Sequence, residues 1–237
     1  MNYYNEIKKE LINNETYKKA KDYSKNKSDL TTYYNVGKLL SEAGKQYGEG
    51  IIKKYSDKLT NELGKGYTIT NLKYMRQFYL YSKSHSVSDL LTWTHYRKLL
   101  PIKNENEVNY YTKIAVEQKL SVRQLENKIK SKEYQRLSED TKEKLAKEDV
   151  MIVSDFIKNP ILIKNSYNYE HISEKILKYL IIEDLDDFLT ELGEGFTYIK
   201  NEYKIKLGDR YNYIDLLLFN YKYNCFVVVE LKVTELK

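Results

Sequence analysis

The stretch from Tyr213 to Lys232 constrains the fold more than any other part of the chain, because it places two strongly apolar runs on either side of a short polar connector. The runs are residues 214–219 and 225–231, and the connector is Asn220–Asn224. β-Branched and aromatic residues bounded by Asn-rich turn chemistry predict a β-hairpin.

A turn centred between Lys222 and Tyr223 fixes which residues face each other across the hairpin. Asp215 then faces Glu230, and alternation puts Lys232 on the same side of the sheet. Both faces are otherwise apolar, so we expect the hairpin to be buried on both sides. Two facing carboxylates in such a place repel each other and raise a pKa, unless a cation lies between them. Two alternatives stay open: a divalent-metal site at Asp215 and Glu230, and a salt bridge at the sheet rim in which Lys232 neutralises Glu230.

An Asp at the start of one strand, followed by Glu-x-Lys at the end of the next, resembles the core of the PD-(D/E)xK nuclease superfamily. Here the pattern is Asp215 and then Glu230-Leu231-Lys232. The longer run ELGEGFTYIKNEYKIKLGDRYNYIDLLLFNYKYNCFVVVELK is similar to the C-terminal domain of the YhcG-like, PDDEXK nuclease domain-containing proteins of bacteria. The runs NELGKGYTITNLKYMRQFYL and LTWTHYRKLLPIKN resemble the other domain of the same family.

The resemblance implies a metal-dependent DNA endonuclease in which Asp215, Glu230 and Lys232 are catalytic. Asp215 and Glu230 would hold Mg²⁺ or Mn²⁺, and Lys232 would position the attacking water. The chain departs from the family at Lys178, which stands where the first core helix usually carries a Glu. Glu174, one turn earlier, is a candidate additional acid. Because the family continues well beyond the point corresponding to Lys232, we also expect a truncated gene product with weak or no cleavage.

Two rival functions follow from these departures. One is a catalytically inactive, truncated DNA-binding or regulatory protein derived from such a nuclease. The other is a protein-interaction or toxin-neutralising module with no nucleic-acid role. A cleavage assay with divalent metal separates the nuclease from the first rival, and salt-dependent DNA retention separates both from the second.

Charge divides the chain into a basic and an acidic part. Residues 1–150 hold 29 Lys and Arg against 20 Asp and Glu, whereas residues 151–237 hold 11 against 14. A basic first half favours contact with DNA, although lysine-rich helical surfaces are common in proteins that bind none. The charged stretch 138–150 has few large apolar residues and reads as a linker. We therefore expect a DNA-binding domain at 1–137 and an incomplete nuclease-like domain at 151–237.

A helix–turn–helix pattern lies within the basic half. Apolar spacing predicts a helix over residues 51–63, which Gly64 ends, and a second helix capped by Thr70. The outer side of the second helix carries Lys73, Arg76 and Gln77, side chains that can read DNA bases and phosphates. The pattern alone favours an ordinary helical hairpin with a solvated outer face, whereas the family resemblance implies a winged-helix-like DNA-binding module.

The fold expected is therefore α+β: a mostly helical, winged-helix-like domain, then a restriction-endonuclease-like α/β domain with a central mixed sheet. The single Cys225 excludes an intrachain disulfide, and no apolar run approaches 18 residues. These features predict a cytoplasmic protein without a membrane segment. DNA is the expected partner, and a homo-oligomer is left open. Trp93 and His95 sit among leucines, so we expect a core histidine rather than a ligand.

Overall fold

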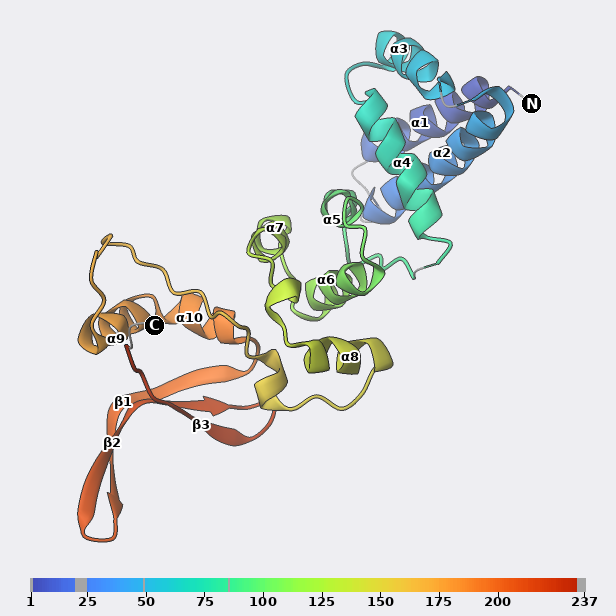
Figure 1. Cartoon of the computed structure of the whole chain (residues 1–237). Helices are drawn as coiled ribbons and strands as arrows, with labels where there is room; N and C mark the ends of the chain where they lie inside the picture. Colours follow the sequence, from blue (N-terminus) through green and yellow to red (C-terminus); the bar gives the residue numbers. More distant parts are fainter. Residues whose placement is uncertain (1, 20–24, 49, 85, 234–237) are drawn as a thin grey trace. The chain divides into compact units, whose positions relative to one another are not determined.

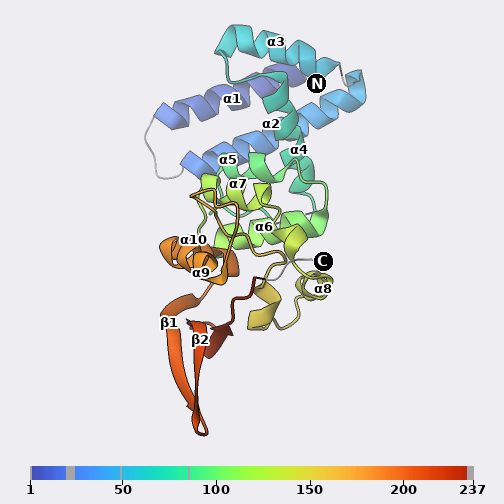
Figure 2. The same ribbon diagram turned by 60° about the vertical axis from the view of Figure 1, so that its left-hand side comes forward.

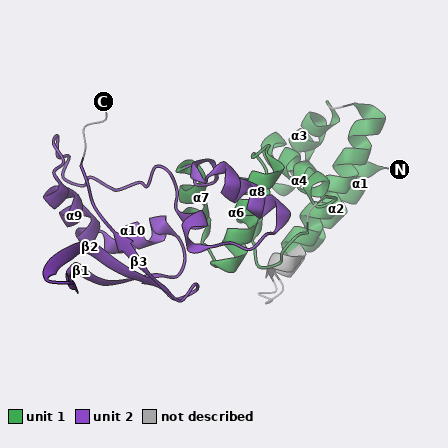
Figure 3. Cartoon of the chain, turned by 60° about the horizontal axis from the view of Figure 1, so that its bottom comes forward, with its two compact units in different colours: residues 1–131 green, residues 132–237 purple. Residues whose placement is uncertain are grey.

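The computed structural model describes residues 2–19, 25–48, 50–84 and 86–233. The chain divides into two compact units, unit 1 (Met1–Ser131) and unit 2 (Lys132–Lys237), as Figure 3 shows. Unit 1 is helical and unit 2 carries the sheet (Figure 1), so the expected α+β class is confirmed. The division falls a few residues before the stretch 138–150, in or just after which we expected the domain boundary.

Unit 1 contains helices α1 to α7, and local sequence sets several of their ends. Gly64 follows α3 with a φ of 101°, a conformation that glycine adopts without strain. The Thr68 hydroxyl accepts the N–H of Asn71, so Thr68 caps α4 instead of the expected Thr70, which already lies in the first turn. The helices are α1 (Tyr3–Lys19), α2 (Lys25–Tyr47), α3 (Ile51–Leu63), α4 (Ile69–Tyr81), α5 (Trp93–Leu99), α6 (Glu105–Glu117) and α7 (Val122–Lys130).

Helices α2 and α4 pack closely in the core of unit 1. A Cβ atom added at Gly37 of α2 would lie 2.1 Å from the carbonyl oxygen of Met75 in α4, so this crossing admits only glycine. Leu72, Met75 and Phe78 on the inner side of α4 are buried, as their spacing predicted. His95 is buried too; its ring nitrogens contact the Thr92 hydroxyl at 2.8 Å and the Leu120 carbonyl at 3.0 Å. The interpretation of His95 as a core residue therefore agrees with its surroundings.

The winged-helix part of the expected fold is not confirmed. Across the described residues of unit 1 the secondary structure is helical, and the strands of the chain all fall in unit 2. A wing is a β-hairpin, so the described part of unit 1 lacks that element. Nor does any helix in the described ranges have a stretch long and apolar enough to cross a bilayer.

The charged stretch expected as a linker folds as a helix in unit 2. Helix α8 (Glu139–Lys147) lies between the short 3₁₀ helices η1 (Tyr134–Arg136) and η2 (Val153–Phe156). The Ser138 hydroxyl caps α8, Lys144 pairs with Asp155 at 3.0 Å, and Thr141 donates to the Asp155 carbonyl at 3.1 Å. Capping and a few polar contacts thus order a segment whose composition lacks large apolar residues.

Unit 2 is built on three strands with two helices against them. Helices α9 (Glu174–Glu183) and α10 (Leu185–Leu192) precede β1 (Phe196–Leu207), β2 (Arg210–Asn220) and β3 (Cys225–Val229). The sheet order is β1-β2-β3 and both pairings are antiparallel, so the described sheet is not the mixed sheet that we expected. The apolar spacing between the cap Ser173 and Gly193 predicts one continuous helix, whereas Asp184 separates α9 from α10.

The described helices cover one face of the sheet, and most of the other face is exposed although Leu217 on it is buried, which corrects the expectation of two-sided burial. Leu216 and Leu218 of β2 are fully buried in a core that includes Ile181 of α9 and Phe188 of α10. On the opposite face of β3, Phe226 is 69% exposed and Val228 is 53% exposed. An apolar residue on a strand is buried only if some element covers it, and the described residues supply helices for a single face.

Candidate active site

The hairpin of β2 and β3 has the register that its sequence predicts. Phe219 pairs with Phe226, and the ladder continues to Leu216 and Val229, where β3 ends. The next residues in this register are Asp215 and Glu230. Glu230 therefore follows directly after the strand, at the same end of the hairpin as Asp215.

A backbone hydrogen bond ties the Glu-x-Lys segment to Asp215. The Leu231 N–H donates to Asp215 Oδ2 at 3.0 Å, and the Leu231 side chain is buried. Glu230 and Lys232 flank it and are both exposed. The structure thus brings the three residues predicted as catalytic to one end of the sheet, with Asp215 half-buried and its two partners facing solvent.

Helix α9 adds two further charged residues to this end of the sheet. The Ser173 hydroxyl caps α9 by accepting the Ile176 N–H, which fixes where the first turn begins. Glu174 in that turn accepts the Val233 N–H at 3.4 Å, just beyond the Glu-x-Lys segment. One turn later, Lys178 Nζ lies 2.7 Å from Asp215 Oδ1.

Glu202 of β1 completes the cluster. Its carboxylate lies 3.4 Å from Lys178 Nζ, so one ammonium contacts carboxylates from two neighbouring strands. Glu202 has a φ of +48°, uncommon for a residue other than glycine, and it falls in a gap of the β1–β2 pairing between Asn201 and Tyr203. This local irregularity sits directly across from Asp215.

The ion pair sets the electrostatics of the site. The Lys178 ammonium and then the Leu231 amide lower the pKa of Asp215, and they outweigh the opposing effect of burial. In turn, the Asp215 carboxylate raises the pKa of Lys178. We expected facing carboxylates to raise a pKa here. The shift at Asp215 is in the opposite direction, because a lysine from α9 supplies the cation.

A divalent metal fits the donor chemistry of this site in part. Asp215, Glu202 and Glu230 offer oxygen ligands, the kind that Mg²⁺ and Mn²⁺ prefer, and Mg²⁺ commonly binds through one or two carboxylates and water. Within the described residues, however, no three His, Cys, Asp or Glu side chains are grouped closely enough to hold a metal by themselves. The Lys178 ammonium lies beside Asp215 and Glu202 in the place of a metal cation. These two carboxylates therefore bind a positive charge, which the lysine supplies.

Comparison with known proteins gives two family models that match the chain. Residues 6–136 match the family model described as the DUF1016 N-terminal domain, and residues 154–237 match the YhcG PDDEXK nuclease domain. The chain belongs to the family of proteins that combine the DUF1016 N-terminal domain with the YhcG PDDEXK nuclease domain. The two matches leave residues 137–153 between them, the region that holds α8.

A relative with the printed name "Putative nuclease YhcG", from Escherichia coli (strain K12), is 26% identical over 247 residues. The match covers 85% of this chain and 66% of the relative, so the chain spans just under two thirds of that protein. No solved structure matches. The family membership agrees with the resemblance seen in the Asp215 and Glu230-Leu231-Lys232 pattern.

The predicted DNA-reading residues lie on α4, in the DUF1016 N-terminal domain. Lys73 and Gln77 are exposed, whereas Arg76 is half-buried. Lys73 and Gln77 therefore remain available to a partner, and Arg76 is partly committed to the protein. These positions are in unit 1, whereas Asp215 is in unit 2.

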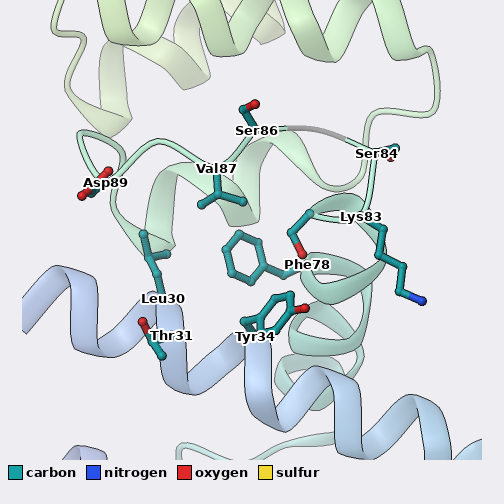
Figure 4. Close-up of a pocket in the computed structure, with 10 residues that line it drawn as sticks. Leu30, Thr31, Tyr34, Phe78, Lys83, Ser84, Ser86, Val87 and Asp89 are labelled. Atoms are coloured by element: carbon teal, nitrogen blue, oxygen red, sulfur yellow. The ribbon is translucent and has the colours of Figure 1, made fainter.

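A pocket of about 680 Å³ lies in unit 1 (Figure 4). Leu30, Phe78 and Val87 line it with apolar side chains, and Lys83 and Ser84 also line it. None of the predicted site residues lines it.

Sequence reasoning located Asp215, Glu230 and Lys232 but missed the contact between Lys178 and Asp215. The signal for this contact was the family resemblance, which put Lys178 where the first core helix usually carries an acid of the metal site.

Proposed function

We propose that this chain is a metal-dependent DNA nuclease whose reaction takes place where Asp215 meets the Glu230-Leu231-Lys232 segment. The observation that carries the proposal is the Leu231 hydrogen bond to Asp215, which joins the two halves of a PD-(D/E)xK pattern within a matching nuclease-domain family. Unit 1 would hold the DNA through its basic helical surface.

Each charged residue has a role that follows from its place. Asp215 and Glu230 would supply carboxylate oxygens to Mg²⁺ or Mn²⁺, and Glu174 is a further acid beside the same segment. The bound metal would polarise the scissile phosphate and acidify the attacking water. Lys232, exposed beside Glu230, would donate a hydrogen bond from Nζ to that water or to a phosphate oxygen. Lys178 has to release Asp215 before the carboxylate can bind metal.

The test is cleavage of DNA by the purified full chain with Mg²⁺ or Mn²⁺ and with a chelator. We expect weak cleavage in the presence of metal, none with chelator, and none for Asp215→Asn. Asp209→Asn, in the exposed turn between β1 and β2, is the matched control and should cleave like the wild type. Equal cleavage by Asp215→Asn would place the reaction elsewhere.

A second candidate function is an inactive DNA-binding protein, favoured by the Lys178 ammonium on Asp215. In that case no metal supports cleavage, but duplex DNA is still retained. The two candidates agree on DNA binding by unit 1 and differ only in the reaction.

Duplex binding by unit 1 is expected to weaken when the outer face of α4 is altered. Lys73→Ala removes one exposed cation, so the slope of log affinity against log salt should become shallower by about 0.9 for one lost phosphate contact. Arg76→Ala and Gln77→Ala should also weaken binding. Lys113→Ala on α6, exposed like Lys73, is the control. Fluorescence anisotropy of the full chain over a salt series makes the measurement, and equal slopes for Lys73→Ala and Lys113→Ala would count against α4 as the DNA-contacting helix.

A further inference from the structure

The outer part of the β1–β2 hairpin forms a two-stranded ribbon. β3 pairs with β2 only from Leu216 to Asn220, whereas β1 and β2 pair on to Leu207 and Arg210. Figure 1 and Figure 2 both show this ribbon, residues 203–213, extending past β3 and past helices α9 and α10. The side chains of the ribbon therefore have little of unit 2 to pack against.

One face of the ribbon alternates lysine and tyrosine. Lys204 pairs with Tyr213 and Lys206 with Tyr211, and directly facing residues in an antiparallel pair point to the same side. Lys204 Nζ lies 3.9 Å from the centroid of the Tyr211 ring, a diagonal contact that agrees with this placement. We call these four residues the Lys–Tyr face.

The Lys–Tyr face is exposed and positively charged. Tyr211 is 56% exposed and Tyr213 is 61% exposed. In the part of the chain that the structure describes, neither Lys204 nor Lys206 has a carboxylate partner within 4.0 Å. Exposed aromatic rings interleaved with lysines that have no carboxylate partner suit a nucleic-acid strand, whose bases stack on the rings and whose phosphates attract the lysines.

This face is continuous with the candidate active site. Tyr211, Tyr213 and Asp215 are alternate residues of β2, so strand alternation places them on one side of the sheet. Tyr213 is two residues from Asp215, or about 7 Å along the strand. A nucleic-acid strand lying on the ribbon would therefore lead its backbone to the Asp215 end of the sheet.

We propose that the Lys–Tyr face binds a single-stranded segment of DNA and leads it to Asp215, an inference that rests on the proposed nuclease function. Single-stranded DNA is favoured over duplex because only unpaired bases offer their faces for stacking on Tyr211 and Tyr213. A two-stranded ribbon can also enter the major groove of a duplex, and that mode would read base edges and phosphates rather than base faces. The two modes respond differently to loss of a tyrosine.

The experiment measures binding of labelled oligothymidylate and of a labelled duplex to the full chain in chelator, where metal-dependent cleavage is absent. Tyr211→Ala should weaken binding to the single strand at least about fivefold and leave duplex binding unchanged. Lys206→Ala should reduce the salt slope for the single strand by about 0.7, the value for one phosphate contact. Circular dichroism confirms that each variant is folded.

Two matched controls lie outside the Lys–Tyr face. Tyr203 pairs with Ile214 on the opposite face of the same ribbon, and Lys175 is exposed on α9. Tyr203→Ala and Lys175→Ala should bind the single strand as the wild type does. Equal weakening by Tyr203→Ala and Tyr211→Ala, or loss of duplex binding alone, would overturn the proposal. Metal-dependent cleavage with unchanged single-strand binding by Tyr211→Ala would refute this inference and leave the nuclease proposal standing. If Tyr211→Ala selectively lost single-strand binding while the wild-type chain cleaved no DNA, single-strand binding by the Lys–Tyr face would stand and the nuclease proposal would be refuted.

Discussion

Lys232→Ala is expected to slow metal-dependent DNA cleavage by about 10²–10⁴-fold, the usual contribution of a positioned proton-transfer or charge-stabilising group. Metal affinity should stay unchanged, because Lys232 is an exposed cation beside the carboxylates and cannot be a ligand. Single-turnover cleavage gives the rate, and titration with Mn²⁺ monitored by electron paramagnetic resonance gives the affinity.

The contrast with Asp215→Asn separates metal binding from chemistry. That variant should lose both, because it removes the carboxylate that the cluster is built around. Lys175→Ala is the control for the loss of a lysine, since Lys175 is exposed on α9 and has no contact with Asp215 in the structure. If Lys232→Ala lost metal binding together with the rate, its role would be to hold the segment in place rather than to assist the reaction.

Lys178→Ala gives the opposite signature at the same site. Its ammonium lies 2.7 Å from Asp215, so a metal has to compete with it for the carboxylate. A nearby opposite charge typically shifts a carboxylate pKa by one to three units, so removing it should strengthen Mn²⁺ binding by roughly tenfold or more. Affinity that stays the same in Lys178→Ala would show that the metal does not use Asp215.

The hairpin could be predicted from sequence because its information is local. The turn residues 220–224 fix the register, and the alternation of apolar residues fixes which side chains share a face. Asp215 and the Glu-x-Lys segment were located by that register alone. Burial was not local: Leu216 is covered by α9 and α10, whereas Phe226 and Val228 are exposed because no described element packs on their face.

Two features of the structure could not be derived from the sequence pattern. Residues 138–150 read as a linker since they lack large apolar side chains, yet Ser138 and the Lys144–Asp155 pair order α8. At the candidate active site, periodicity could place Lys178 on a helix but could not show that the helix brings it to Asp215. Ion pairs join elements that are distant in sequence, and no repeat or propensity records them.

A buried group of ion pairs holds the start of unit 2 against α10. Lys158 and Glu133 lie 3.8 Å apart with side chains only 2% and 6% exposed. Lys158 also donates to the Glu191 carbonyl, and Arg136 forms an ion pair with the Glu191 carboxylate and donates to the Pro160 carbonyl at 2.8 Å. Four charged residues with so little solvent depend on one another, because a buried charge without its partner is costly.

Glu191 makes this group sensitive to acid. Burial raises the pKa of Glu191, but Arg136, the Leu162 amide and Lys158 together lower it below its ordinary value. A carboxylate whose pKa is depressed on folding stabilises the protein above its unfolded pKa of about 4.3. That stability is lost as the pH falls through the lower pKa of the folded state. Unit 2 should therefore become less stable as the pH falls below about 4.3 and Glu191 becomes protonated.

Lys158→Met is expected to destabilise unit 2 by about 3–5 kcal/mol, because it removes one partner of a buried ion pair and leaves Glu133 without that cation. Hydrogen exchange at the amides of β2 reports the stability of unit 2 in the full chain. Lys147→Met is the matched control: its pair with Glu143 has side chains 65% and 71% exposed, so the loss should stay below about 1 kcal/mol. Adding Glu133→Leu to Lys158→Met should recover part of the stability, since the buried carboxylate is then gone. Equal effects of Lys158→Met and Lys147→Met, or no recovery in the double variant, would show that the buried ion pairs do not hold this part of unit 2 together.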